Sequence, residues 1–281
     1  MFSPTATLIR AAQVGGYAVG AFNIYNLEGV QAVVAAAEAE RSPALLQIHP
    51  SALRHGGQPL LALCLAAARE STAPVTVHLD HSTSPDDIRA ALEAGLSSIM
   101  ADGSHLAYDN NVAFTREMAA LAHRHGAAAE AELGRLSGTE DGLTVEEYEA
   151  RLTDPAQAAG FITQTGADLL AVCIGNVHGR YPGAPQLDFT RLAAIRRAVA
   201  APLVLHGASG LPEEQVRRAI ELGVCKFNVN TELREAYVAA LRTRLSAASA
   251  PDVLDLMSDA VAAMQEVVAG KLRLFGSSSR A

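Results

Sequence analysis

Short apolar runs alternate with longer amphipathic segments along the whole chain of 281 residues. The short runs have the length and β-branched content of buried strands, whereas the longer segments have the length of helices. This alternation predicts βα units around a parallel sheet. Strands are expected near residues 18–24, 44–49, 75–80, 97–101, 127–133, 168–174, 202–206 and 224–229. Eight such runs, each followed by a helix-sized segment, favour an α/β fold of the closed TIM (β/α)8 barrel type. A doubly wound sheet is the alternative.

The helix-sized segments carry their own start signals. Pro155 follows Asp154, and Pro212 is followed by two glutamates, so both segments begin with a proline where a first helical turn accepts one. We expect helices at residues 27–40, 58–71, 85–95, 109–126, 154–166, 190–200, 212–222 and 231–248.

Two segments fall outside this rhythm. Residues 133–153 form a polar, glycine-containing stretch after the fifth strand, and long loops at this end of a barrel strand usually serve the active site. Residues 251–271 predict an extra amphipathic helix after the eighth unit, and residues 272–281 predict a tail with a small apolar plug. No linker or further repeat divides the chain, so residues 1–281 are predicted to form a single barrel domain.

Composition narrows the classes of function. Hydrophobic residues make up 49% of the chain, which supplies one large core. The formal net charge is −8, and no basic run or patch offsets it, so nucleic acid is not an expected partner. An anionic substrate would need a local positive potential.

The cysteines and the N-terminal residues indicate the compartment. Cys64, Cys173 and Cys225 are odd in number and widely spaced, and two lie in strand-like runs, so buried thiols are expected rather than disulfides. The first residues lack the regions of a secretory signal, and no stretch of ~18 residues is continuously apolar. We expect a soluble, cytoplasmic protein without a membrane partner.

Histidines end three of the predicted strands. The third strand ends in His78, Asp80 and His81, and the sixth and seventh lead to His178 and His206. In a barrel the C-terminal strand ends face one shared pocket, so these residues become neighbours. Any one of these histidines alone would ordinarily be interpreted as a polar residue at a loop. Three imidazoles with an open fourth position are the pattern of a catalytic zinc, which favours His81, His178 and His206 as ligands.

Carboxylates gather at the same level of the predicted barrel. Asp80 adjoins His81, Asp102 ends the fourth strand, and Glu130 and Glu132 alternate along the fifth so that both face the same side. A barrel interior is normally apolar, so an inward carboxylate is costly unless a metal or hydrogen bonds satisfy it. We therefore expect Asp102 and Glu132 to be functional.

Two glycine- or asparagine-containing loops precede predicted helices. They are His206-Gly207-Ala208-Ser209-Gly210 and Asn228-Val229-Asn230-Thr231. The loops after strands seven and eight are the usual phosphate site of such barrels. Backbone N–H groups and a helix N-terminus there supply the positive potential that the net charge lacks.

These motifs together resemble the class II, zinc-dependent ketose-bisphosphate aldolases, which include fructose- and tagatose-bisphosphate aldolases. The resemblance covers nearly the whole chain. It rests on Ala21-Phe22-Asn23, His78-Leu79-Asp80-His81, Asp102-Gly103-Ser104, Glu130-Ala131-Glu132-Leu133-Gly134, Glu140-Asp141, Gly175-Asn176-Val177-His178-Gly179, His206-Gly207-Ala208-Ser209-Gly210 and Asn228-Val229-Asn230-Thr231.

The resemblance implies a role for each matched position. The zinc ligands would be His81, His178 and His206. Asp80 would be the acid/base at the aldehyde oxygen, and Glu140 would shuttle the proton at the nucleophilic carbon. Asp102 and Glu132 would match acidic positions tied to a second or alternative metal site. Substrate- and phosphate-binding positions, often accompanied by a monovalent cation (Na⁺ or K⁺), would be Asn23, Gly179, Gly207, Ser209, Asn228, Asn230 and Thr231.

The implied reaction is reversible cleavage of a ketose 1,6-bisphosphate to dihydroxyacetone phosphate and an aldehyde. Fructose 1,6-bisphosphate is the first expectation, tagatose 1,6-bisphosphate the second, and another phosphorylated ketose or deoxy-keto acid follows. Zinc would stabilise the negative charge of the enediolate as a Lewis acid. After His178-Gly179 the family often has a lysine, where this chain has Arg180.

Two alternatives remain at this point. A class I aldolase works through a lysine Schiff base, and Lys226, one of only two lysines with Lys271, shares the strand parity of Asn228. The three histidines argue against it. The second alternative is a non-catalytic companion subunit of an aldolase complex. The complete set of ligands and acid/base groups argues against this alternative. The resemblance also implies a homodimer or homotetramer.

Overall fold

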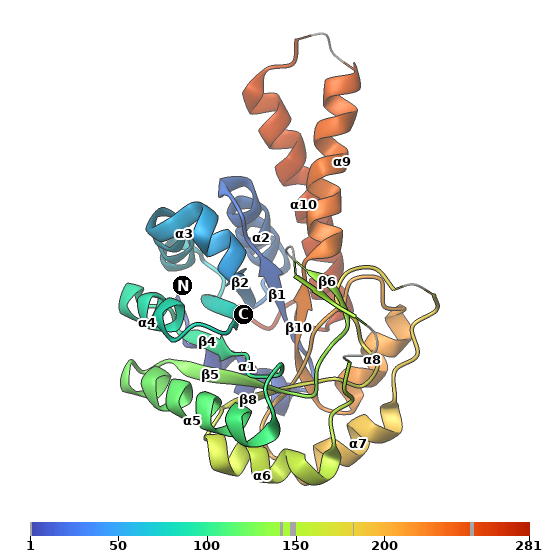
Figure 1. Cartoon of the computed structure of the whole chain (residues 1–281). Helices are drawn as coiled ribbons and strands as arrows, with labels where there is room; N and C mark the ends of the chain where they lie inside the picture. Colours follow the sequence, from blue (N-terminus) through green and yellow to red (C-terminus); the bar gives the residue numbers. More distant parts are fainter. Residues whose placement is uncertain (1, 141–142, 147–149, 182, 248–249) are drawn as a thin grey trace.

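Eight parallel strands form a closed barrel in the computed structural model, which describes residues 2–140, 143–146, 150–181, 183–247 and 250–281 (Figure 1). Their order around the barrel is β1-β10-β9-β8-β5-β4-β3-β2. The predicted TIM barrel is therefore confirmed. The strands are β1 (Val19–Asn23), β2 (Ala44–Ile48), β3 (Val75–Ser82), β4 (Ser98–Ala101), β5 (Ala128–Leu133), β8 (Leu169–Val172), β9 (Leu203–Leu205) and β10 (Val224–Val229).

Helices follow the strands around the barrel. They are α2 (Leu27–Glu40), α3 (Pro50–Glu70), α4 (Pro85–Ala94), α5 (Tyr108–Arg124), α6 (Pro155–Thr165), α7 (Phe189–Ala198), α8 (Glu213–Glu221) and α9 (Thr231–Ala247). The start signals act as expected at α6, where the Asp154 side chain accepts a hydrogen bond from the N–H of Ala156. The first part of α3 lies ahead of its predicted start, and Gly57, with a φ of 57°, separates it from the rest of the helix.

One helix, α1 (Thr5–Gly15), precedes the first strand and is not predicted by the sequence pattern. Its N-cap, Pro4, makes no side-chain hydrogen bond, so the usual start signal is absent. Ile9 and Ala12 of α1 belong to the same buried cluster as Val19 and Met100 from the barrel strands. This helix therefore closes the N-terminal mouth of the barrel, away from the predicted site.

The segment expected to be a loop, 133–153, contains an antiparallel hairpin of β6 (Gly138–Glu140) and β7 (Leu143–Val145). Gly138 bridges to His178, and a side chain at this glycine would place its Cβ 2.1 Å from the His178 carbonyl oxygen. Only glycine allows this approach. The hairpin is therefore held directly against the segment that carries a predicted ligand.

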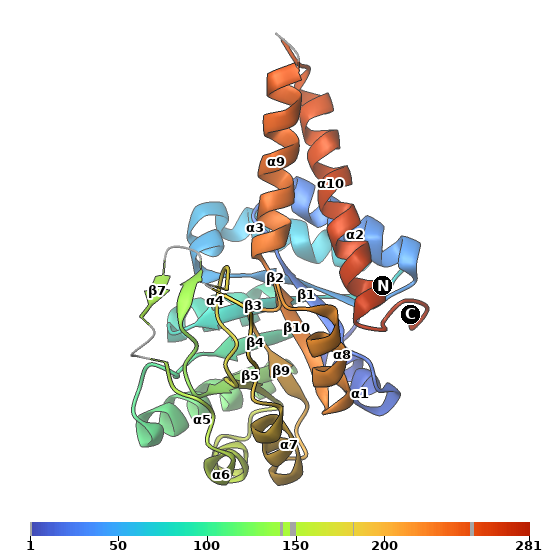
Figure 2. The ribbon, with the colours of Figure 1, turned by 90° about the vertical axis from the view of Figure 1, so that its right-hand side faces the viewer.

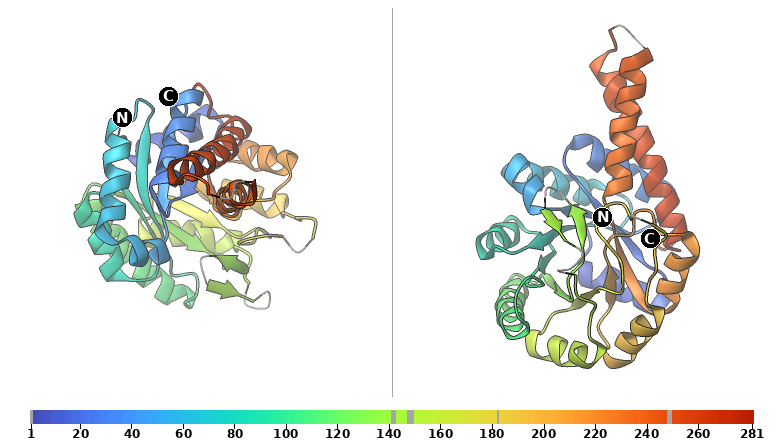
Figure 3. Two further views of the ribbon diagram at one scale, coloured as in Figure 1. Left: turned by 90° about the horizontal axis from the view of Figure 1, so that it is seen from above. Right: turned by 45° about the vertical axis from the view of Figure 1, so that its right-hand side comes forward.

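The final helix, α10 (Val253–Leu274), runs beside α9, and the two form an arm that projects from the barrel (Figures 1 and 2). Figure 3 shows the same pair from above. The helix ends three residues beyond its predicted end at residue 271. The predicted apolar plug is Phe275, which is buried and stacks on Phe227 with ring centroids 4.8 Å apart. Among the described residues, no helix is long and apolar enough to cross a membrane.

Candidate active site

Three histidines meet at the C-terminal end of the barrel, as the sequence predicts. His81 comes from β3, while His178 and His206 lie in the segments that follow β8 and β9. One ring nitrogen from each lies within 4.8 Å of the others, and the Nε2 of His81 is 2.8 Å from the Nδ1 of His206. His81 and His206 are buried, so their nitrogens face one another in a region largely shielded from water.

The backbone of His81 is unusual, because it adopts a φ of 41°. Such a value is uncommon for a residue with a side chain and is typical of functional sites. The β3–β4 register also shifts between Leu79 and Ser82, which turns the end of the strand. His81 is therefore aimed into the barrel by a local distortion of β3.

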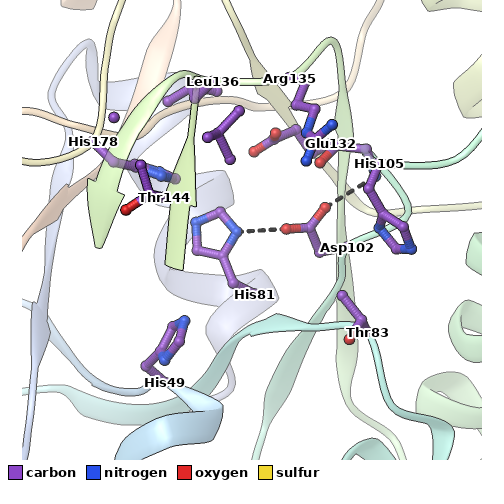
Figure 4. Close-up of a pocket in the computed structure, with 13 residues that line it drawn as sticks. His49, His81, Thr83, Asp102, His105, Glu132, Arg135, Leu136, Thr144 and His178 are labelled. Atoms are coloured by element: carbon purple, nitrogen blue, oxygen red, sulfur yellow. Dashed lines mark hydrogen bonds and ion pairs between the residues drawn. The ribbon is translucent and has the colours of Figure 1, made fainter. Parts of the chain in front are cut away.

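Asp102, at the end of β4, holds the His81 ring from its other side (Figure 4). The Nδ1 of His81 donates to the Oδ2 of Asp102 at 2.7 Å, and the N–H of Ser104 donates to the Oδ1 at 3.0 Å. Burial opposes the charged form of His81, but Asp80 and Asp102 outweigh it and raise the pKa of the imidazole well above its ordinary value. Burial likewise opposes the charged form of Asp102, yet the hydrogen bond from His81 holds the pKa of that carboxyl well below its usual range.

Glu132 on β5 completes the acidic group beside the histidines. Its Oε2 lies 3.8 Å from the Nδ1 of His206. Burial, together with the nearby charge of Asp102, raises the pKa of Glu132 to about 8. Two neighbouring carboxyls are thus pushed in opposite directions, which is typical of sites where protons or cations are handled.

Asp80 is held by amide side chains from two other strands. Its Oδ1 accepts from the Nδ2 of Asn228 at 3.2 Å, and its Oδ2 accepts from the Nε2 of Gln47 at 2.9 Å. The same Gln47 nitrogen also lies 3.0 Å from the Oδ1 of Asn23. The structure thus joins the predicted Asp80, Asn23 and Asn228. It adds Gln47, whose only sequence signal is its place at the C-terminal end of β2.

Glu130 belongs to a buried network that the sequence does not reveal. Its Oε1 accepts from the Nε2 of His206 at 2.9 Å, and its Oε2 lies 2.9 Å from the Nζ of Lys226. That Nζ also donates to the Oδ1 of Asn228 at 2.8 Å. Burial and the charge of Lys226 hold the pKa of the neighbouring His78 well below its usual value. The inward Lys226 is therefore engaged in an ion pair. The only sequence signal for its inward position is that it alternates with Asn228 along the strand, so both side chains face the same side.

The predicted phosphate-binding residues gather around a second hollow, of about 240 Å³. Gly179, Ser209 and Thr231 all line it. The N–H of Gly210 donates to the carboxylate of Glu232 at 2.6 Å, and Lys271 pairs with that carboxylate at 2.7 Å. The N–H of Gly210 is thus engaged by a carboxylate, and Lys271 offsets the charge of that carboxylate.

Two of the remaining predicted positions, Gly207 and Asn230, lie close in sequence to residues that line this hollow, and Arg180 lines it directly. Gly207 follows β9 with a φ of 66° and packs on the carbonyl of Val177. The buried Asn230 accepts a hydrogen bond from the hydroxyl of Tyr25 at 2.8 Å. Arg180, at the position of the family's lysine, is mostly exposed and pairs with Glu235 at 2.8 Å.

The hairpin covers the histidine cluster. A cavity of about 380 Å³ is lined by Leu136, Gly138 and Thr144 from the hairpin region, and by His81, His178 and Glu132. Figure 4 shows Leu136, Thr144, His81 and Glu132 around it. Arg135 and His105 line the same cavity. The predicted Glu140 ends β6, but its side chain lies outside the described part of the chain.

Comparisons with known proteins agree with this geometry. The model of the family "Fructose-bisphosphate aldolase class-II" matches residues 3–280. A putative fructose-1,6-biphosphate aldolase from Coccidioides immitis is 36% identical, with a TM-score of 0.93 over 99% of this chain and 97% of that one. The YdjI aldolase from Escherichia coli K12 is 34% identical, with a TM-score of 0.90 over 100% of both chains. The fructose-bisphosphate aldolase of Campylobacter jejuni, 19% identical over 100% of this chain and 97% of that one, shares the fold with a TM-score of 0.82. The chain therefore belongs to the class-II fructose-bisphosphate aldolase family and is an aldolase, a carbon–carbon lyase.

Proposed function

We propose that this aldolase reversibly cleaves a ketose 1,6-bisphosphate to dihydroxyacetone phosphate and glyceraldehyde 3-phosphate, with fructose 1,6-bisphosphate as its first substrate. The observation that carries the proposal is the meeting of three imidazoles, Asp80 and the glycine-rich turns at one end of the barrel. The name of the Coccidioides structure supports fructose 1,6-bisphosphate, whereas that of the Escherichia coli structure specifies only an aldolase. This activity would belong to glycolysis.

The donor set fits a zinc ion. His81, His178 and His206 bring one nitrogen each into a group of 4.8 Å, and three imidazoles leave the open position of a catalytic zinc site. Asp102 binds the remote nitrogen of His81, as carboxylates do beside metal-binding histidines. When bound there, zinc supplies a Lewis acid that stabilises negative charge on the triose oxygens. Glu132 and Asp102 would serve a second or alternative metal position beside it.

The proton transfers are assigned to two carboxyl groups of this chain. Asp80, held between Gln47 and Asn228, would give and take the proton at the aldehyde oxygen. Two amide donors fix its carboxylate, so its direction is set before the substrate arrives. Glu140, at the end of the β6 strand, would move the proton at the nucleophilic carbon.

The triose phosphate would lie at the hollow beside Ser209 and Thr231. Gly179, Gly207 and Gly210 allow the backbone to come close to the phosphate oxygens. Asn228 and Asn230 would border this half of the substrate, and a Na⁺ or K⁺ ion would share it. Anchoring this end holds the nucleophilic carbon against the aldehyde, which lowers the entropic cost of the reaction.

The substrate is tested by comparing kcat/KM for fructose and tagatose 1,6-bisphosphates with the purified zinc enzyme and a chelator control. The two sugars differ at one carbon, so discrimination depends on the partner of one hydroxyl. A tagatose value about tenfold higher, equal to about 1.4 kcal/mol, would replace fructose as first choice. No chelator-sensitive triose phosphate from either sugar would reject both in favour of another phosphorylated ketose or a deoxy-keto acid.

The assembly is proposed to be a homodimer or homotetramer. Apolar side chains on the arm support it, because Leu245 of α9 and Val253 and Leu254 of α10 are exposed in the single chain. The three buried free thiols support a reducing, cytoplasmic compartment. The light-scattering mass of the purified protein tests the assembly, and a monomer would contradict it.

A further inference from the structure

The segments that follow β8 and β9 touch at one point beside the histidine cluster. Gly207 approaches the carbonyl of Val177 so closely that a side chain would place its Cβ 2.0 Å from that oxygen. Only glycine allows this contact. Val177 precedes the proposed ligand His178, and Gly207 follows the proposed ligand His206. The spacing of the two segments therefore sets the spacing of two ligands, whose rings stack with centroids 6.1 Å apart.

The hydroxyl of Tyr181 bonds to the backbone of both segments at this point. It donates to the Gly207 carbonyl at 3.0 Å and accepts from the N–H of Val177, whose nitrogen lies 3.4 Å away. Burial raises the pKa of this phenol above its ordinary value, so the hydroxyl keeps the proton that it donates. A second side chain, the buried Asn176, donates from its Nδ2 to the neighbouring carbonyl of His206 at 3.1 Å. Two donors from the first segment thus hold consecutive carbonyls of the second.

The ring of Tyr181 reaches the phosphate hollow. Tyr181 lines that hollow together with Gly179, Ser209 and Gly210. A Cβ at Gly210 would lie 3.9 Å from the Cδ2 of the tyrosine, which is ordinary van der Waals contact. One side chain therefore reaches both halves of the triose site. Its hydroxyl binds the backbone beside two histidines, and its ring borders the hollow.

We infer that Tyr181 is a positioning residue that fixes the distance between the histidine cluster and the phosphate hollow. A triose phosphate has oxygens for the cluster at one end and a phosphate for the hollow at the other. Both ends bind together only when the two anchors stand at the right separation, and a misplacement of about 1 Å can cost about 10²-fold in rate. This inference rests on the proposed function and deepens it, because it concerns how the proposed triose half is held.

The test compares Tyr181→Phe, which removes only the hydroxyl, with the wild-type zinc enzyme and with Tyr108→Phe. Tyr108 is the matched control, because its hydroxyl accepts a hydrogen bond from Gln164 at the protein surface and does not line the hollow. We expect Tyr181→Phe to lower kcat/KM for exchange of the carbon-bound proton of dihydroxyacetone phosphate in deuterium oxide by roughly 3- to 10-fold, the range for one hydrogen bond. Zinc content and the inhibition constant of inorganic phosphate stay unchanged, because each of these ligands uses one anchor alone.

Other outcomes separate this inference from the proposed function. Carbon-proton exchange as fast as in the wild type would overturn it, and so would an equal loss of inorganic phosphate or zinc, since Tyr181 would then serve one anchor only. No exchange by the wild-type enzyme would reject the proposed function instead. Amide hydrogen exchange by mass spectrometry then decides: faster exchange in the peptides around both Val177 and Gly207, in Tyr181→Phe and not in Tyr108→Phe, supports the positioning role. Wild-type protection of either peptide rejects it.

Discussion

Lys226 and Glu130 form an ion pair inside the barrel, with the Nζ of the lysine 2.9 Å from the Oε2 of the glutamate and both side chains buried. The other oxygen of Glu130 accepts a hydrogen bond from the Nε2 of His206. Glu130 therefore orients a proposed metal ligand, and Lys226 offsets the charge that this role buries.

Replacing the lysine alone should destabilise the fold strongly. Lys226→Met leaves Glu130 buried without its cation, which costs roughly 3–5 kcal/mol. The double variant Lys226→Met/Glu130→Gln should recover part of this loss, because no uncompensated charge remains. Urea unfolding monitored by circular dichroism measures the free energy of unfolding of the single and the double variant. A single variant as stable as the wild type would show that the pair contributes little.

The same ion pair predicts that Lys226 is not a Schiff-base nucleophile. Its Nζ is already engaged by Glu130 and Asn228, and the histidine cluster supplies a metal route instead. Sodium borohydride with dihydroxyacetone phosphate should leave the intact mass of the protein unchanged. An adduct that appears in the wild type and is lost in Lys226→Met would mean a class I mechanism.

The barrel itself could be predicted from the sequence because its signal is local. Each buried strand is a short apolar run, and several helices begin at a side-chain cap, as α2, α4 and α6 do at Asn26, Ser84 and Asp154. The helix α1 lacks this signal, since Pro4 makes no side-chain cap and the helix packs across the barrel mouth through Ile9 and Ala12. Its place follows from contacts with strands that lie far along the chain, which no local pattern encodes.

The active-site residues also divide into those that a local sequence pattern could identify and those that it could not. His81, His178 and His206 could be found because a histidine at a barrel strand end has a predictable position. Gln47 and the Glu130–Lys226 pair depend on which inward side chains meet across the barrel. Which side chains meet depends on the register between neighbouring strands. This register places Gln47 of β2 beside Asn23 of β1 on one side and His78 of β3 on the other. Residue type and spacing do not specify such cross-barrel pairs.

Loss of one proposed ligand should remove most of the zinc. His206→Ala is expected to retain much less than one zinc per chain, because only two imidazoles of the cluster remain. The control is His123→Ala, an exposed histidine on α5 that pairs with Asp168. Metal analysis after dialysis measures both variants. Full occupancy in His206→Ala would reject this ligand set.

Asp80 should matter for turnover and not for metal binding. Asp80→Ala is expected to lower kcat by ~10²–10⁴-fold, the typical contribution of a positioned acid/base, while zinc content stays normal. The exposed Asp86→Ala is the control. A similar loss is expected for Glu140→Ala. Near-normal turnover by Asp80→Ala would reduce its role to orienting Gln47 and Asn228.

The raised pKa of Glu132 predicts that the stability of the metal-free protein depends on pH. Burial and the charge of Asp102 raise its pKa from 4.5 to about 8, so the folded state binds a proton that the unfolded state releases. This contribution is fully present below about pH 4.5 and is lost as the pH rises toward about 8, at up to about 1.4 kcal/mol for each pH unit.

Replacing Glu132 by glutamine isolates this contribution. Glu132→Gln keeps a neutral side chain of similar size at every pH, so its stability should fall less steeply than that of the wild type across this range. His81, whose pKa is also raised, loses stabilisation in the same direction as the pH rises, and Glu132 is one of the charges that raise it, so the variant also reduces this contribution. The difference between the two urea-unfolding curves, measured with chelator from pH 5 to pH 8, therefore reports on Glu132. Parallel stability profiles would mean that Glu132 titrates alike in the folded and unfolded states, and that burial beside Asp102 does not hold its proton.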